Sequence, residues 1–167
     1  MPDLPSVIVP TSSLAWMEQR LVELVPLSAA FQSRVGVSNQ ADAARWVHRT
    51  MLLPTGLDGV ERPCALVEQG DFSLRRVDNN HLRPASTLQL VLTDWLPWPD
   101  EPGWSMLDFK NFVGGVLDDL ALLQGQDTNL PIESMTLPLS RLGVSDPRSG
   151  SERQYLIAVI AVEMSNK

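Results

Sequence analysis

The sequence predicts an α+β domain with a five-stranded, mostly antiparallel sheet and helices packed on one face. Two observations in the last third of the chain support this prediction. Residues 106–124 carry apolar side chains at steps of three and four, the pattern of a helix with one buried face. Two strand-like segments follow, 132–139 and 155–164, with a polar loop between them. Strands joined by short turns pair antiparallel, which gives the expected sheet.

The chain is expected to open with an irregular arm and an amphipathic helix. Residues 1–11 contain three prolines, each of which removes a backbone donor and restricts the residue before it. The helix is expected to begin at Ser12 or Ser13, because a serine hydroxyl can cap free backbone amides. Apolar residues then recur at helical spacing until Pro26, where the helix should stop.

Two further helices and the end of the helical region are predicted next. A short helix is expected over 28–34, ending at Gly36. Another is expected over 39–53, because apolar residues recur on one side of it and Pro54 terminates it. We place a single α+β domain at 12–167, behind the arm.

The middle of the chain is expected to form three strands. Segment 62–69 alternates in strand fashion, and Gly70 with Asp71 signals a turn before a second strand at 72–77. Residues 78–80 tolerate left-handed backbone angles and mark another reversal. The clearest strand is 86–95, where leucines alternate with more polar residues, so one face of the sheet should meet the core.

The closing strand, 155–164, is mostly apolar on both of its alternating rows. A strand that is apolar on both faces is normally covered on both faces. In a chain of 167 residues, either a second layer of the domain or a neighbouring subunit must provide that cover. Assembly with other subunits is therefore one of the two arrangements that the sequence leads us to expect.

The composition is that of an acidic chain without signs of export. A formal net charge of -7 argues against a surface that binds nucleic acid, because such surfaces concentrate Lys and Arg. The single cysteine excludes an intrachain disulfide and a multi-cysteine metal cluster. No signal-peptide pattern and no run of about 18 apolar residues occurs, so we expect a cytosolic protein.

Candidate catalytic residues are few. Cys64 with His48 or His81 would be a nucleophile and a base. Cys64 lies in an apolar strand-like run, where a small buried side chain is the usual outcome. His48 is expected on a solvated helix face and His81 in a turn, without further ligands at metal-binding spacing. The sequence therefore favours neither an enzyme nor a metal or cofactor site.

The long helix contains acidic and glycine pairs with structural explanations. Asp118 and Asp119 point about 100° apart on a helix, so they cannot converge on one substrate atom and are expected at its polar edge. Gly114 and Gly115 weaken a helix, and a close backbone approach would explain them. The cap of this helix is expected at Ser105 or Asp108, and Gly125 stands where the helix is expected to stop.

Three arginines, Arg75, Arg76 and Arg83, form the densest basic cluster of the chain. Because Glu68 and two aspartates lie near them in the sequence, we expect ion pairs across a hairpin and not a nucleic-acid site. The cluster therefore adds no candidate for binding chemistry.

The remaining candidates are contact surfaces. The proline-rich connector 96–104 carries two tryptophans that either contact a partner or fold back over the sheet edge. The polar loop 143–154 either orders against a neighbouring subunit or is a plain hairpin tip. The protein-interaction residues that we expect are Trp98, Trp104, Asp146, Arg148, Glu152, Arg153 and Tyr155.

Five segments together resemble a known family. They are RPCALVEQGDFSLRRV, STLQLVLTDWLP, FKNFVGGVLDDLALLQG, LPIESMTLPLSR and QYLIAVIAVEM. Over roughly residues 12–164, the chain is similar to the tail-completion or tail-terminator proteins of tailed bacteriophages and prophages. The similarity lies in the order of the helices and strands and in the general pattern of residues. No catalytic signature belongs to this resemblance, and it fixes no functional residue.

The resemblance implies a small α+β subunit that forms a homo-oligomeric ring, commonly a hexamer, at the head-proximal end of the tail tube. Such a ring stops tube growth and docks to the head connector, without a cofactor and without catalysis. Its partners are then tail-tube and head-connector proteins, and no membrane. An acidic lumen would let DNA pass without adhering, since like charges repel. The expected location is the virion tail, assembled in the bacterial cytoplasm.

Two other functions remain open from the sequence. One is a small-molecule-binding or enzymatic α+β domain that uses the sheet face opposite the helices and has a pocket with converging polar groups. The other is an adaptor of a contractile injection apparatus, which shares the logic of a ring. Gene neighbourhood separates them, because a tail subunit should lie among head, tube and tape-measure genes.

Overall fold

The computed structural model describes residues 12–49, 61–77, 82–96, 105–126, 132–138, 141–144 and 154–165. The helical segments are α1 (Ser13–Leu24), η1 (Val25–Leu27), α2 (Ala29–Val35), α3 (Gln40–Ala43), η2 (Ala44–Trp46) and α4 (Met106–Gln126), where η marks a 3-10 turn. The strands are β1 (Val47–Arg49), β2 (Cys64–Arg76), β3 (Leu82–Trp95), β4 (Ile132–Thr136), β5 (Leu142–Val144) and β6 (Tyr155–Ser165). The expected arm at 1–11, Pro54 and the reversal at 78–80 lie outside the described residues.

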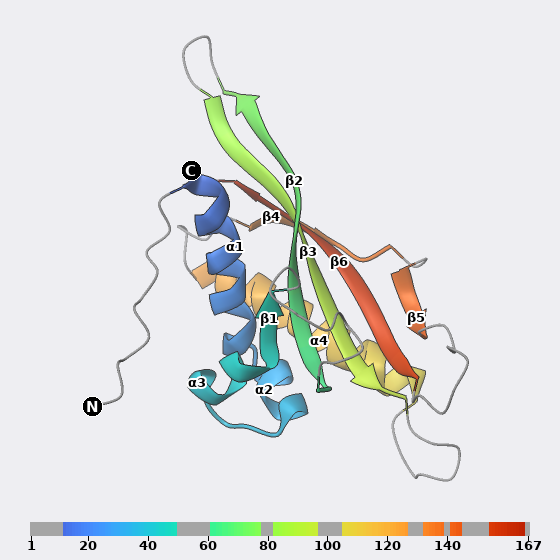
Figure 1. Cartoon of the computed structure of the whole chain (residues 1–167). Helices are drawn as coiled ribbons and strands as arrows, with labels where there is room; N and C mark the ends of the chain where they lie inside the picture. The colour runs from blue at the N-terminus through green and yellow to red at the C-terminus, as the bar shows by residue number, and fades with distance from the viewer. Residues whose placement is uncertain are drawn as a thin grey trace.

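The strands form one mixed sheet. Its order is β1-β2-β3-β6-β4, and β5 pairs with β6 farther along the same edge that pairs with β4 (Figure 1). β1 runs parallel to β2, and the other pairs are antiparallel. The predicted α+β class is confirmed. The sheet differs from the expected one in being mixed and in having six described strands instead of five.

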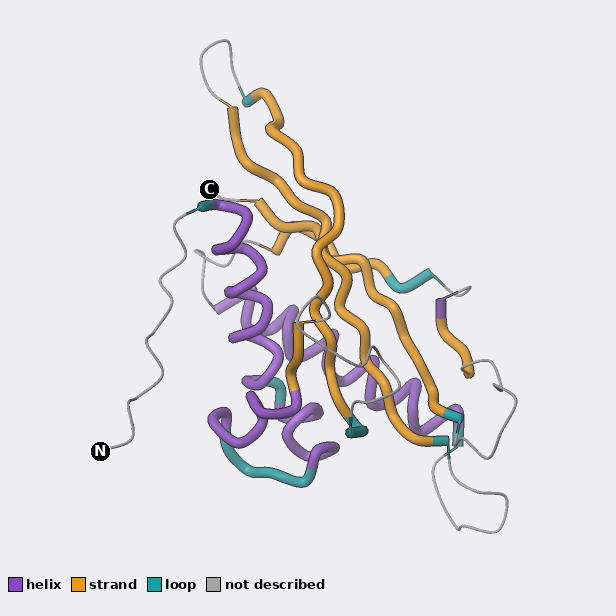
Figure 2. Tube along the Cα trace, in the orientation of Figure 1, coloured by secondary structure: helices purple, strands orange, loops and turns teal. Residues whose placement is uncertain are grey.

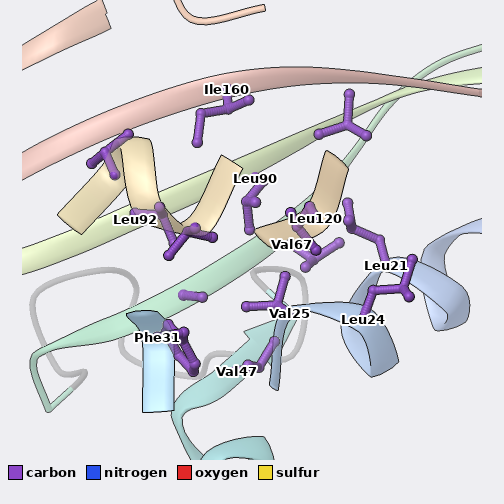
Figure 3. Packing of buried hydrophobic residues seen from close by; sticks show 14 of the residues in the cluster. Leu21, Leu24, Val25, Phe31, Val47, Val67, Leu90, Leu92, Leu120 and Ile160 are labelled. Atoms are coloured by element: carbon purple, nitrogen blue, oxygen red, sulfur yellow. The ribbon is translucent and has the colours of Figure 1, made fainter. Parts of the chain in front are cut away.

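The hydrophobic core lies between the sheet and the helices, which cover one face of it, as the sequence predicts (Figure 2). Apolar side chains of α1, α2 and α4 meet the inward rows of β2, β3 and β6. Leu90, Leu92 and Ile160 point from the sheet into this cluster, where Phe31 and Leu120 come from helices (Figure 3). Each such side chain contributes about 1.5–3 kcal/mol on burial, so this layer dominates the stability of the fold.

A carboxylate on α4 holds the start of α2. Ser28 caps α2, because its hydroxyl accepts a hydrogen bond from the Phe31 amide at 3.1 Å. The same hydroxyl donates to Asp119 Oδ2 at 2.7 Å, and the Ala30 amide donates to that oxygen at 3.0 Å. Asp119 therefore completes a helix cap from a distant part of the chain. Both aspartates were expected at the polar edge of α4. Asp118 is exposed there, whereas Asp119 is half-buried against α2.

The two glycines of α4 have different surroundings. A Cβ at Gly115 would lie 2.9 Å from the Ala30 Cβ, so the absence of a side chain lets α2 approach α4. A Cβ at Gly114 would meet no atom within 4 Å. The close approach expected for both glycines therefore explains only Gly115 within this chain.

The ends of α2 and α4 test the capping predictions. α2 ends at Gly36, whose φ of 76° lies in the left-handed region, as expected for a C-cap. At the start of α4, the Asp108 amide donates to Ser105 Oγ, and the Ser105 amide donates to Asp108 Oδ2 at 2.7 Å. This reciprocal pair is a capping box, so the predicted start is confirmed. The predicted stop at Gly125 is wrong, since α4 extends to Gln126.

The prediction of a helix over 39–53 is correct for its first turns and wrong at Val47–Arg49. Asn39 caps α3, since its side chain accepts a hydrogen bond from the Asp42 amide. The helical part ends at Trp46, and Val47–Arg49 forms β1 against Ala65–Val67 of β2. Strand pairing satisfies the backbone groups there and buries Val47, so tertiary contacts override the helical spacing.

The turn expected at Gly70 and Asp71 is also wrong, because β2 passes through both residues as one strand. The pairing with β3 shifts between Gln69 and Phe72, which marks a β-bulge. A Cβ at Gly70 would lie 2.0 Å from the Thr87 carbonyl oxygen. Glycine is therefore required here by a close approach of two backbones and not by a reversal of the chain.

The end of the chain also departs from the sequence prediction. The strand expected over 132–139 ends at Thr136, and residues 137–138 are not in a strand. A short additional strand, β5, begins at Leu142 and so occupies the start of the segment expected to be a polar loop. Both β4 and β5 pair with the same edge of β6.

We predict that Asp119→Ala lowers the free energy of unfolding by about 1–2 kcal/mol, because it removes two hydrogen bonds at the start of α2. Asp118→Ala is the matched control, since the neighbouring carboxylate is exposed, and its effect should stay within about 0.5 kcal/mol. Urea unfolding followed by circular dichroism measures both. Equal effects of the two variants would contradict the capping role of Asp119.

We predict that Gly70→Ala destabilises the chain by about 1–3 kcal/mol, because the new methyl group would collide with the Thr87 carbonyl. Gly114→Ala should instead raise the stability by about 0.5–1 kcal/mol, because alanine favours a helix and the space is open. Thermal and urea unfolding compare the two variants with the unchanged chain. A neutral Gly70→Ala would show that the bulge does not depend on glycine.

Candidate interaction surfaces

The largest group of exposed apolar side chains among the described residues lies on the outer part of the β2–β3 hairpin. We call residues 72–77 and 82–84 the hairpin arm; it projects beyond the rest of the sheet (Figure 1). β1 pairs only with Ala65–Val67, and the pairing of β6 with β3 reaches only Ala85. Among the described strands, neither outer edge of the arm has a neighbour. Such an edge can pair with another chain.

The two faces of the hairpin arm differ in chemistry. Residues that lie directly opposite in an antiparallel pair share a face. One face carries Phe72, Leu74, Arg76, Leu82 and Pro84, and the other carries Ser73, Arg75 and Arg83. Eight large apolar side chains are exposed among the described residues, and four of them, at 72, 74, 77 and 82, lie on the arm. Leu74 is 55% exposed and Leu82 is 59% exposed, so the arm has an uncovered apolar face.

Among the described residues, the arginines of the arm do not form the ion pairs expected across the hairpin, and Asp78, one of the expected partners, lies outside them. Arg75 lies directly opposite Arg83, a pairing of like charges. Arg75 instead forms an ion pair with Glu133 of β4 at 3.6 Å. Within the described part of the chain, Arg76 and Arg83 have no ion pair. The arm therefore offers positive charge beside its apolar face.

The second face of the sheet is only partly covered. Cys64, Leu66 and Val91 are buried on it, and Ile157 and Val159 of β6 pack against them. Along β6 the helix-side row is buried, while the other row, from Tyr155 to Glu163, is half-buried. The expectation that both faces of this strand are covered therefore holds completely only for the helix side.

Tyr155 is the one expected interaction residue inside the described part of the chain. It lies opposite Trp95 in the β3–β6 pair and is half-buried. The Arg62 guanidinium carbon lies 3.8 Å from the centre of the Tyr155 ring and 5.0 Å from that of Trp95. Arg62 is 5% exposed, so a buried cation joins these two rings.

The other expected interaction residues lie outside the described residues, so their contribution stays a prediction. They are Trp98, Trp104, Asp146, Arg148, Glu152 and Arg153. Tyr155 is the first residue of β6, and four of these residues lie shortly before it in the sequence. No contact between Tyr155 and the other expected residues is described, because those residues lie outside the described part of the chain.

Charged groups near the start of α4 stabilise the fold. Arg34 of α2 forms an ion pair with Asp94 at the end of β3, and Asp94 is almost fully buried. Burial lowers the pKa of Arg34, while the nearby Asp94 carboxylate opposes that change. Hydrogen bonds from Ser105 lower the pKa of the exposed Asp108. These charges link α2, β3 and α4 and do not converge on a reaction centre.

The candidate nucleophile and base are embedded in the sheet. Cys64 is fully buried, with Sγ 3.2 Å from Thr93 Oγ1, and burial raises the pKa of its thiol. His48 lies in β1 and not on the solvated helix face that was expected, and burial lowers its pKa. His81 lies outside the described residues. In the part of the chain that the structure describes, no group of three His, Cys, Asp or Glu residues is placed to hold a metal ion.

The apolar hairpin arm was not recognised in the sequence. Phe72 and Leu74 alternate with polar residues in the way of any half-buried strand, and only the pairing in space shows that both are exposed beyond the ends of the neighbouring described strands. In the sequence, the cluster of three arginines was the one sign that this segment differs from an ordinary strand.

Among the described helices, none is long and apolar enough to cross a membrane.

Comparisons with known proteins give structural likenesses but no match in sequence. No protein-family model matches the sequence, and no curated protein matches it. Among solved structures, the chain is similar to one from "Virion of native gene transfer agent (GTA) particle". The sequences are 12% identical, the match covers 93% of this chain and 100% of that chain, and the TM-score is 0.42. Values this low carry no function from one chain to the other, so the proposal below rests on this chain itself.

We predict that the Cys64 thiol does not react with a thiol reagent in the folded protein between pH 7 and 9 and reacts fully after unfolding. Because its pKa is raised by folding, the thiol stays protonated while the unfolded thiol ionises near pH 9, so this group removes stability as the pH rises above that value. Absorbance of the released reagent measures the reaction. Rapid native labelling would contradict a purely structural cysteine.

Proposed function

We propose that this protein is a structural subunit of a phage or prophage tail. In this role it forms a ring at the head-proximal end of the tail tube, stops tube growth and docks to the head connector. The proposal combines the resemblance of the sequence to tail-completion proteins with the surfaces of the chain. It assigns the protein to the virion tail, assembled in the bacterial cytoplasm.

The hairpin arm is the observation that carries the proposal. Its apolar side chains are exposed on paired strands that have free outer edges. Large exposed apolar patches of this kind mark protein interaction sites. A subunit that acts by touching other subunits needs such a surface, whereas an isolated catalyst does not.

The half-buried row of β6 supports the same role. Ile157 and Val159 complete a small apolar cluster on the sheet face that the helices leave open. A neighbouring subunit that covers this row would gain the burial that the chain alone does not provide. The arm and this row thus give two separate regions for contacts in an assembly.

The charge balance fits a ring through which DNA passes. The chain has 20 acidic and 13 basic residues, which gives a net charge of -7. A lumen lined by negative charge repels the phosphate backbone and limits adhesion of DNA in transit. DNA is therefore a passing cargo in this proposal and not a specific ligand.

Non-enzymatic action is part of the proposal. Cys64 is buried with a raised pKa, which disfavours the thiolate that a nucleophile needs. The buried Asp94 is committed to Arg34, and Asp119 is committed to the cap of α2. These commitments leave little support for the alternative of an enzymatic domain. No cofactor is needed for the proposed role.

The direct test is assembly with the tail-tube protein from the same gene neighbourhood. The full chain and the tube protein are purified separately, mixed, and followed by light scattering and negative-stain electron microscopy. We expect a ring-sized oligomer, and tubes that end in a cap and stop lengthening when this protein is added. The mean tube length should fall as the ratio of this protein to tube protein rises.

Tubes incubated with bovine serum albumin are the control for nonspecific effects. A strict monomer that leaves the tube length unchanged at every ratio would contradict the proposed function. Binding along the sides of the tubes, with no cap, would also contradict it. Capping of the tube of a contractile apparatus in place of a phage tail would favour the adaptor alternative.

A further inference from the structure

We propose that the hairpin arm of one copy packs across the outer face of α4 in the next copy. This inference rests on the proposed ring and names the contact that would hold the ring together. The occupant of the arm's apolar face is thus a second copy of this chain.

The outer face of α4 has an exposed stripe that the core does not use. Its members recur at steps of three and four and therefore share one side of the helix: Leu107, Asn111, Gly114, Asp118 and Leu122. Leu107 is 65% exposed and Leu122 is 64% exposed, although both are large and apolar. The core takes the opposite side of α4, with Phe109, Val116 and Leu120. The stripe is therefore free to meet a partner.

Gly114 lies at the middle of this stripe, and the contacts within the chain do not require it. A Cβ at this position would meet no atom within 4 Å, in contrast to Gly115, which has to accommodate Ala30. Glycine in the middle of a helix is less favourable than alanine. A strand that passes close to α4 from another copy would give this glycine a function.

The arm and the stripe match in size and chemistry. From Leu107 to Leu122, α4 rises by about 22 Å, and the run from Phe72 to Val77 extends for about 17 Å. The apolar face of the arm carries one charged residue, Arg76, and the stripe carries one, Asp118. Both side chains are exposed and have opposite charges. Apolar contacts around one ion pair therefore join the two surfaces.

Charge on the rest of the chain also favours this pairing between copies. The arm contributes three arginines, at 75, 76 and 83, to a chain whose net charge is -7. Without these three arginines the chain would carry -10, since -7 minus 3 is -10. A basic arm is thus attracted to the acidic body of another copy, which raises the rate of encounter.

The contact joins two different surfaces of the same chain. Such a head-to-tail interface leaves one arm and one α4 stripe free at the ends of any open chain of subunits. If the rotation between neighbouring copies closes on itself, every arm contacts the stripe of the next copy and the copies form a ring. The proposed contact is therefore consistent with a closed ring, whereas a reciprocal exchange of arms between two copies would give a two-fold dimer.

A charge exchange tests the contact in the full-length protein. Arg76→Asp and Asp118→Arg should each raise the dissociation constant for self-assembly by about tenfold or more, because each places like charges together. The double variant should recover most of the wild-type affinity. Sedimentation velocity and mass photometry, with and without tube protein, measure assembly, and circular dichroism checks folding. Arg83→Asp, on the other face of the arm, is the matched control and should not be rescued by Asp118→Arg.

Disulfide trapping gives an independent test. Leu74→Cys and Gly114→Cys chains are mixed and oxidised, and a covalent dimer on a nonreducing gel is expected only from the mixture. Ser73→Cys is the matched control, because it lies next to Leu74 on the opposite face of the arm, and it should not crosslink to Gly114→Cys. The native Cys64 is fully buried and does not compete.

The outcomes separate this inference from the proposed function. Rings that form normally in both single charge variants, with no crosslink through Gly114→Cys, would overturn the α4 contact and leave the ring intact. A crosslink from Ser73→Cys equal to that from Leu74→Cys would overturn the assigned face of the arm. A chain that never assembles, alone or with tube protein, would contradict both the contact and the proposed function.

Discussion

The position of β6 beside β3 constrains the whole molecule. The two strands pair along eleven residues, from Ala85 with Ser165 to Trp95 with Tyr155. This long pairing fixes which row of β6 faces the helices and which row faces away. Because the helix-side row fills the core, the apolar residues of the other row cannot also be placed there. The fold of the single chain therefore leaves apolar surface that another chain can cover.

The hairpin arm follows from the same arrangement. β2 and β3 continue together after β1 and β6 end, so their outer parts have no described strand on either side. The bulge at Gly70 adds one residue to β2, which places Phe72 and Leu74 in the row opposite Ser86 and Pro84. The extra residue of this bulge, at which Gly70 lies close to the Thr87 carbonyl, thus determines which side of the arm is apolar.

Local signals predicted much of the helical layer. Ser28 and Gly36 marked the ends of α2, and Ser105 marked the start of α4, because capping depends on residues near one another in the chain. Val47 was included in the helix expected over 39–53, yet it is buried from a strand. The edge of β2, which pairs with it, is far away in the sequence and cannot be inferred from spacing. The cap of α2 by Asp119 was hidden for the same reason.

The contact surface could be predicted only in part. The apolar excess of β6 is visible in its sequence, whereas the exposure of Phe72 and Leu74 depends on how far neighbouring strands extend. Gly70 shows the same limit, since a glycine signals a turn or a bulge equally well until its partner strand is known. Of the expected interaction residues, Tyr155 alone lies in the described part of the chain. The interface proposed here therefore comes from pairing and burial.

Amide hydrogen exchange of the full chain, compared between dilute monomer and assembly with tube protein, tests the central claim most directly. The claim is that this protein functions through surfaces that its own fold leaves uncovered. We expect residues 72–77 and the outer face of α4 to gain protection on assembly, while the β3–β6 pairs remain unchanged because they are protected already. Unchanged exchange in the hairpin arm and in α4 within a verified assembly would contradict the account.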